Sequence, residues 1–164
     1  MKTKGEIVTA GIDYRIITSY EGFKTIPHTT LKEVNISDVD LFLIPGGQPD
    51  ILLENKDLHK FLVNLNSKNK IIAAICAAPI HLAKAGILNL RKFTTSLPVD
   101  EFPEFNNGIY VNESVVVDDN IVTAKPNGYV DFAIEIGKIM NIYKDETDLE
   151  ETIQFFKYFK DAQQ

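Results

Sequence analysis

The sequence predicts one α/β domain with a mainly parallel sheet at its centre. Residues 39–44 and 71–75 are mostly apolar along their whole length, which is typical of parallel strands covered on both faces. Between them, apolar residues recur at helical spacing at Leu58, Phe61, Leu62 and Leu65. A strand, an amphipathic helix and a second strand form a βαβ unit, whose crossover is right-handed. A length of 164 residues is sufficient for one compact domain of this kind.

The elements before and within this unit follow from local signals. Residues 7–10 and 15–19 are expected to be short strands, the second ending at the Gly22 turn. The helix of the βαβ unit is expected to begin after Asp57, a suitable N-cap residue.

The next elements surround and follow the single cysteine, Cys76. Residues 77–85 are expected to be helical, because Pro79 is tolerated in a first turn and Gly86 suits the position after a helix end. Residues 115–117 and 121–123 are expected to pair as a hairpin across a polar turn.

Two helices close the chain. Residues 130–140 carry apolar side chains on one side, and residues 147–150 form the capping-box pattern that opens a last helix. The last helix has more aromatic residues than one buried face needs, so it is a candidate surface for a second subunit and a homodimer. With no repeat and no linker, residues 1–164 are expected to form a single domain.

Charge and composition exclude several classes of protein. The net charge is −6 with scattered acidic residues, which argues against a nucleic-acid partner. A single cysteine cannot form an internal disulfide. No apolar segment resembles a signal peptide or is long enough to span a bilayer, so we expect a cytoplasmic protein without a membrane partner. No residue spacing suggests a metal site or a phosphate-binding glycine motif, and no cofactor is expected.

Cys76 lies where an apolar strand is expected to pass sharply into a helix. A nucleophile on such a turn needs small residues two positions before and after it, because the strained backbone brings those positions close together. Ala74 and Ala78 occupy these positions. Because a helix N-terminus favours thiolate over thiol, we expect Cys76 to lose its proton more readily than a free cysteine. The alternative is a buried cysteine that acts only as a small apolar side chain.

A second loop is expected to lie beside Cys76. Pro45-Gly46-Gly47 ends the other strand of the βαβ unit, and ligands of open α/β sheets bind beyond the carboxyl ends of the strands. A Gly-Gly turn lets backbone N–H groups approach a reacting oxygen, as an oxyanion hole requires. The alternative is an ordinary tight turn.

These segments resemble, in order, the ThiJ/PfpI superfamily, which has the class I glutamine amidotransferase-like fold, and especially its small bacterial protease or amidase members. The resemblance is carried by LFLIPGG, AAICAAPIHLAKAGIL, FTTSLP, SVVVDDNIVTAKPNG and DFAIEIGKIM. It implies a flavodoxin-like three-layer sandwich with Cys76 as the reactive residue. It also places the N–H groups of Gly47 and Ala77, beside Gly46, around an oxyanion. Residues that the resemblance places at the border of the site are Pro45, Thr95, Ser96 and Asn127.

Two departures from the family pattern bear on activity. The family opens with a strand and a helix that carry an acid touching the cysteine, whereas this sequence opens at what resembles the second strand. We therefore expect an N-terminally truncated chain, with apolar side chains exposed along residues 39–44 and 71–75. The alternative is that another strand, from this chain or from a partner, fills the vacant place in the sheet. In addition, Ala77 stands where the protease-like members have a histidine directly after the cysteine.

The three histidines of the chain do not replace the missing one. His28 is expected in a loop or edge strand, His59 on the polar side of its helix, and His81 more than one helical turn beyond Cys76. No histidine follows His81, so a downstream Cys-His-acid triad within one chain is excluded. We expect no histidine within hydrogen-bonding reach of the Cys76 sulfur.

Three functions remain open. The first is an enzyme in which Cys76 attacks the carbonyl of an amide or of a small aldehyde, with classical peptidase activity weak or absent. The second is a non-catalytic thiol domain, a redox sensor or stress-response protein in which Cys76 is oxidised. The third is a scaffold whose catalytic surroundings have decayed.

Overall fold

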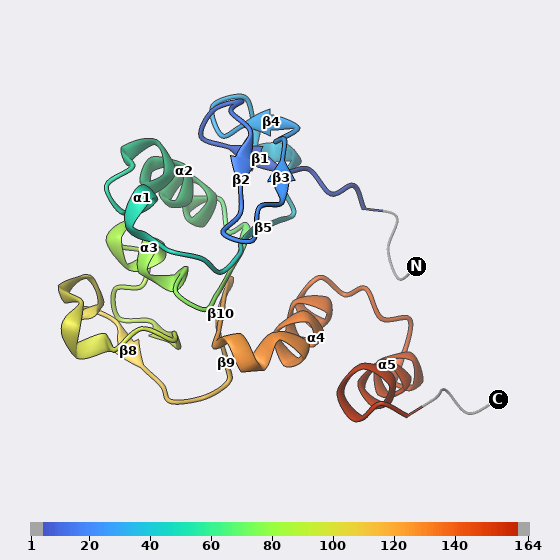
Figure 1. Ribbon diagram of the computed structural model, residues 1–164. Coiled ribbons are helices and arrows are strands. Elements are labelled where there is room, and N and C mark those ends of the chain that lie inside the picture. The colour runs from blue at the N-terminus through green and yellow to red at the C-terminus, as the bar shows by residue number, and fades with distance from the viewer. Residues whose placement is uncertain (1–4, 161–164) are drawn as a thin grey trace.

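The computed structural model describes residues 5–160, and its centre is a four-stranded sheet (Figure 1). The strand order is β5 (Leu41–Ile44), β6 (Ile71–Ile75), β10 (Ile121–Ala124) and β9 (Val115–Asp118). The first three strands are parallel, and β9 pairs antiparallel with β10 across the expected hairpin, with Val122 opposite Val117. The predicted mainly parallel sheet is therefore confirmed.

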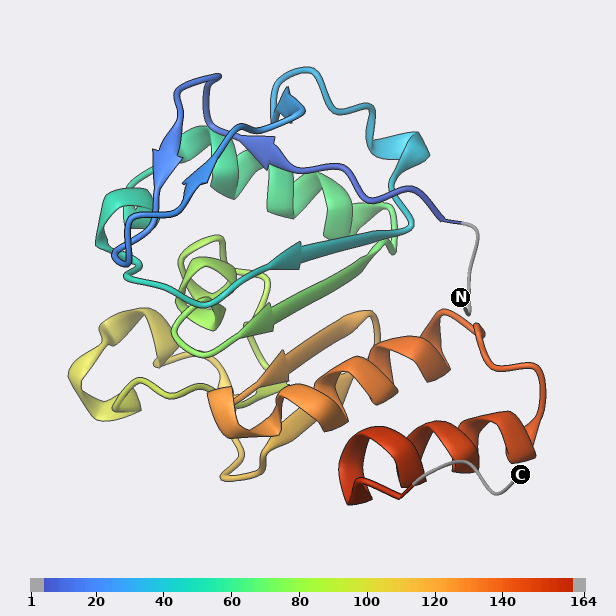
Figure 2. The ribbon, with the colours of Figure 1, turned by 45° about the vertical axis from the view of Figure 1, so that its right-hand side comes forward.

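Helices cover both faces of this sheet (Figure 2). On one face lie α1 (Asp50–Leu53), α2 (Lys56–Ser67) and α3 (Pro79–Lys84). The buried cluster on this face includes Ile72 of β6 and, from the helices, Leu58, Leu62, Leu65, Ile80 and Leu82. On the other face, α4 (Tyr129–Ile139) packs Phe132 and Ile136 against Ala73 and Val122. Ile72 and Ala73 thus point to opposite faces, as successive residues of a strand do. The result is the flavodoxin-like three-layer α/β sandwich that the resemblance implies.

Short elements complete the described chain. The remaining strands pair two by two: β1 (Ala10–Gly11) with β4 (Thr29–Thr30), β2 (Ile17–Thr18) with β3 (Lys24–Thr25), and β7 (Lys92–Phe93) with β8 (Ile109–Tyr110). Single 3₁₀ turns occur at η1 (Ile36–Asp38), η2 (Val99–Glu101), η3 (Pro103–Phe105) and η4 (Pro126–Gly128). The last helix, α5 (Glu146–Tyr158), lies beside α4, to which the Lys157–Asp131 ion pair of 2.7 Å joins it (Figure 1).

The N-terminal strands are shorter than the sequence predicts. Of residues 7–10 only Ala10 is in a strand, and Ile7 is 88% exposed. β1 pairs with β4 and not with the main sheet, so the residues before it have no neighbouring strand to extend them. Likewise, only Ile17–Thr18 of residues 15–19 is a strand, in an exposed hairpin.

Two helix starts also differ from the prediction. Asn55, not Asp57, caps α2, because its side chain accepts a hydrogen bond of 2.8 Å from the Leu58 N–H. Helix α5 begins before the predicted capping box, because the Asp145 carboxylate accepts from the Asp148 N–H at 2.9 Å. In both cases a side chain two residues before the predicted cap bonds to a free N–H group of the first turn.

Within the described chain, β5 pairs only with β6, so β5 is an edge of the main sheet. Leu43 of β5 is 43% exposed, as expected for residues 39–44. The same expectation is wrong for β6, where Ile72, Ala73 and Ala74 have no exposed surface. The reason is that β6 lies between β5 and β10 and is covered on both faces.

Candidate active site at the Cys76 turn

Cys76 follows the last residue of β6 and occupies a sharp turn before α3. Its φ of 67° is positive, a conformation that is strained for a residue with a side chain. The Cys76 N–H donates to the Ala124 carbonyl at 2.9 Å, and the Ala78 N–H donates to the Ile75 carbonyl at 3.2 Å. Ala74 and Ala78 are buried on either side of the turn. The predicted turn between a buried strand and a helix, with a strained cysteine, is confirmed.

The Gly46 backbone lies directly against the cysteine. A Cβ atom added at Gly46 would be 2.9 Å from the Cys76 Cβ and 3.6 Å from its sulfur, so only glycine fits without a shift of the backbone. Pro45, Gly46 and Gly47 form an exposed loop immediately after β5. The structure therefore brings the predicted Gly-Gly loop and the cysteine together at the carboxyl ends of two neighbouring strands.

Two backbone donors next to the cysteine remain available. In the described part of the chain, the N–H groups of Gly47 and Ala77 donate to no other residue. Ala77 is buried directly after Cys76, and no atom would lie within 4 Å of a Cβ at Gly47. An oxyanion hole needs backbone N–H groups that are not already bonded within the protein.

The segment after β7 contacts Cys76 more closely than the sequence predicts. The Thr95 hydroxyl and the Ser96 N–H both donate to the Cys76 carbonyl, at 2.9 Å and 3.0 Å. The Ser96 hydroxyl donates to the Cys76 sulfur at 3.4 Å. These contacts join positions 19 and 20 residues apart, so only the position of FTTSLP after a strand could have indicated them.

Asn127 is the remaining residue that the resemblance places at the border of the site. Asn127 is exposed in η4, after β10, and makes no hydrogen bond to Cys76. Over residues 5–160, no cluster of histidine, cysteine and acidic residues could hold a metal ion.

None of the three histidines hydrogen-bonds to the cysteine. His28 is exposed and its Nδ1 is 2.7 Å from the Thr9 hydroxyl. His59 is half-buried, and burial is the main cause that lowers its pKa. His81 is 3% exposed, its Nδ1 has no partner among the described residues, and its pKa is lowered first by burial and second by His59. The prediction that no histidine reaches the sulfur is confirmed.

Fold and turn together define a class: an α/β sandwich with one cysteine on a strained strand-to-helix turn at the carboxyl edge of its sheet. The chain belongs to the DJ-1/PfpI family, whose profile matches residues 2–139. No helix among residues 5–160 is long and apolar enough to cross a membrane.

Individual relatives agree with this assignment. The chain is 30% identical to the "Uncharacterized protease YoaZ" of Bacillus subtilis (strain 168), over 87% of this chain and 70% of the relative. It is 29% identical to the "Deglycase PfpI" of Pyrococcus furiosus, over 78% of each chain. The crystal structure of a DJ-1 superfamily protein from Agrobacterium tumefaciens superposes with a TM-score of 0.79 at 29% identity, over 93% of this chain and 84% of that one. In eight of the curated relatives, the matched part spans 53% to 78% of the relative's length.

Proposed function

We propose that the chain is a cysteine-dependent enzyme that acts on small reactive aldehydes, with Cys76 as its nucleophile. The observation that carries the proposal is the strained Cys76 turn, with the Gly46 backbone packed against the cysteine. Relatives named as deglycases support a carbonyl substrate. An amide substrate is the less favoured choice, because among residues 5–160 no histidine or carboxylate hydrogen-bonds to the sulfur, where it could protonate a leaving amine.

The proposed first step is addition of the thiolate to the carbonyl carbon. A carbon–sulfur bond forms as the electron pair of the carbonyl double bond moves to its oxygen. The N–H groups of Gly47 and Ala77 then stabilise this oxyanion, and a proton from water neutralises it to give a hemithioacetal. No cofactor takes part in this step.

The test measures the loss of methylglyoxal with the purified chain and with Cys76→Ala. We expect turnover by the wild type and none by the variant. Ser67→Ala is the control, because Ser67 is exposed at the end of α2 and precedes the amino end of β6, whereas Cys76 follows its carboxyl end. Equal rates for the wild type and Cys76→Ala would refute the proposal. A parallel assay with fluorogenic peptides is expected to show no hydrolysis.

A thiol redox sensor is the second candidate function. The observation that favours it is that Ser96, a residue that cannot act as a base at neutral pH, is the side chain bonded to the sulfur. Peroxide would oxidise the thiolate to a sulfenic acid and be reduced to water. Mass spectrometry after peroxide treatment distinguishes the two: oxidation at Cys76 together with no aldehyde turnover would favour the sensor.

A homodimer is the proposed assembly, with α5 at the interface. Helix α5 exposes three aromatic side chains, Phe155, Phe156 and Tyr158, which are between 49% and 57% exposed. Adjacent exposed apolar side chains of this kind often mark a surface that contacts another protein. Light scattering at micromolar concentration is expected to give twice the monomer mass of 18.4 kDa. Phe156→Glu is expected to give the monomer mass, and a wild type that is already monomeric would refute the assembly.

A further inference from the structure

The Cys76 sulfur has one side-chain hydrogen-bond partner in the described part of the chain, the hydroxyl of Ser96 at 3.4 Å. This distance is normal for a hydrogen bond to sulfur, which is larger than oxygen. No imidazole and no carboxylate takes part. The groups that usually activate a thiol by accepting its proton are thus replaced by a neutral donor.

Hydrogen bonds to the Cys76 carbonyl hold the Ser96 segment beside the cysteine. The Ser96 N–H donates to the Cys76 carbonyl at 3.0 Å, and the Thr95 hydroxyl donates to the same carbonyl at 2.9 Å. Thr95 is 2% exposed. One residue earlier, Thr94 donates from its N–H to the Thr123 hydroxyl at 2.9 Å and from its own hydroxyl to the Glu113 carbonyl at 2.8 Å. The segment is therefore fixed at three successive residues, and the hydroxyl needs little reordering to reach the sulfur.

A hydroxyl donor favours the charged form of a cysteine. A thiolate accepts a stronger hydrogen bond than a neutral thiol, since hydrogen bonds to ions are about twice as strong as neutral ones. The donor does not take up the proton, which passes to water because Cys76 is partly exposed. The equilibrium between thiol and thiolate therefore shifts toward the thiolate, and no group of the site takes up the proton.

We propose that Ser96 is a positioning residue that stabilises the Cys76 thiolate in place of an acid or a histidine. The inference rests on the proposed function, because that reaction starts from the thiolate. It assigns to Ser96 the task of setting the pH at which Cys76 becomes reactive, and to Thr95 the task of holding the Ser96 segment.

The experiment measures the rate of alkylation by iodoacetamide between pH 5 and pH 10. For Ser96→Ala we expect the pH of half-maximal rate to rise by about 0.5 to 1 unit, and the rate at pH 7 to fall about three- to tenfold, because one hydrogen bond to the thiolate is lost. For Ser96→Thr, which keeps a hydroxyl, we expect a profile within about 0.2 units of the wild type. Cys76→Ala supplies the baseline.

Ser67→Ala is the matched control, because Ser67 is exposed at the end of α2 and bonds only to the Asn64 carbonyl. A folded Ser96→Ala protein with the wild-type profile would overturn the proposal. A Ser96→Thr profile that moves with Ser96→Ala would overturn it too, because the hydroxyl would then be irrelevant. The readout needs no aldehyde turnover. A wild type that is inactive on methylglyoxal but shows the Ser96 shift would refute the enzyme and leave the role of Ser96 intact.

Discussion

At Gly46 the chain offers no room for a side chain. An added Cβ would meet the Cys76 Cβ at 2.9 Å, and because this atom is close to the backbone the strain cannot be relieved at the far end of a flexible side chain. Overpacking of this kind costs about 1–3 kcal/mol. The same contact sets the position of the sulfur, so stability and reactivity are linked at this residue.

We therefore expect Gly46→Ala to lower both the free energy of unfolding, by about 1–3 kcal/mol, and the alkylation rate of Cys76. Urea unfolding and iodoacetamide kinetics measure the two effects. Gln48→Ala is the control, since Gln48 is exposed in the same loop, and we expect it to change neither. A Gly46→Ala protein with wild-type stability and rate would show that the loop adapts freely.

His81 makes stability depend on pH. Burial lowers its pKa in the folded protein, and the second cause is His59, which faces it from α2. Lys84 on α3 and Glu54 after α1 are the charged groups acting on His59. The unfolded chain binds a proton at His81 near pH 6.5, whereas the folded chain binds it only at lower pH. Protonation of His81 therefore does not lower the free energy of unfolding above about pH 6.5, and it lowers this free energy as the pH drops below that value.

For His81→Leu we expect a smaller loss of stability between pH 7 and pH 5 than for the wild type. Thermal melting across this range measures the difference. His28→Gln, which changes an exposed histidine, is expected to keep the full wild-type loss. An identical pH dependence for His81→Leu and the wild type would assign the loss to other groups.

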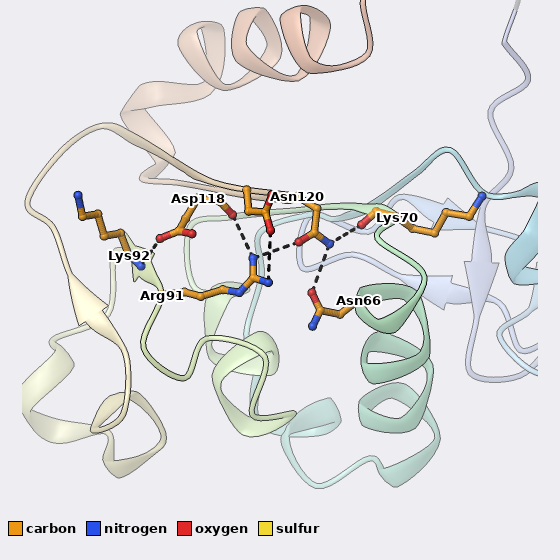
Figure 3. Close-up of polar contacts among 7 residues, drawn as sticks. Asn66, Lys70, Arg91, Lys92, Asp118 and Asn120 are labelled. Carbon is orange, nitrogen blue, oxygen red and sulfur yellow. Dashed lines mark hydrogen bonds and ion pairs between the residues drawn. The ribbon is translucent and has the colours of Figure 1, made fainter.

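Among the elements, the amino ends of the parallel strands are joined by a polar network (Figure 3). Asn120, which is 5% exposed, donates to the Lys70 carbonyl at 2.8 Å and to the Asn66 side chain at 3.3 Å. Its own side-chain oxygen accepts from Arg91 at 3.1 Å. The network thus connects β10, β6, α2 and the segment before β7 at the end of the sheet opposite Cys76.

We expect Asn120→Ala to lower the free energy of unfolding by about 1–3 kcal/mol, because it leaves buried polar groups without partners. The alkylation rate of Cys76 should stay at the wild-type value, since the site lies at the other end of the strands. Urea unfolding and alkylation measure these outcomes. Asn106→Ala, at an exposed asparagine, should stay within about 0.5 kcal/mol of the wild type. A loss of alkylation in Asn120→Ala would instead show that the two ends are coupled.

The sequence predicted elements better than their contacts. The turn at Cys76, the hairpin ending at β10 and the Gly86 helix end depend on local residues and are as expected: Gly86 has a φ of 75° and donates to Ala83 at 2.8 Å. The α2 cap was assigned to Asp57 rather than Asn55, because both residues suit an N-cap and geometry alone separates them. The bond between Ser96 and the sulfur depends on how the segment after β7 meets the Cys76 turn, which no local pattern encodes.

At the scale of the whole molecule, β5 is the open edge of the main sheet. Alternate amides of β5 point away from β6 and have no strand to pair with in the described chain. We expect these amides to exchange with solvent much faster than those of Ile72 to Ala74, which are buried between two strands. Hydrogen exchange followed by mass spectrometry or NMR measures the contrast.

Protection of every β5 amide would contradict this prediction and would mean that another strand covers the edge in solution. That result would not fit the expectation of an open edge along residues 39–44.

An open apolar edge is also a hazard for association between molecules, because unpaired strands of two copies can join and grow into aggregates. The residues around β5 restrict such growth. Asp40 precedes the strand and Pro45 follows it, so a charge and a residue without an N–H limit any intermolecular ladder to Leu41–Ile44. Four residues are fewer than the six or seven that typical amyloid-forming segments contain. The proline that begins the Gly-Gly loop at the cysteine therefore also keeps the exposed edge from becoming a template for aggregation.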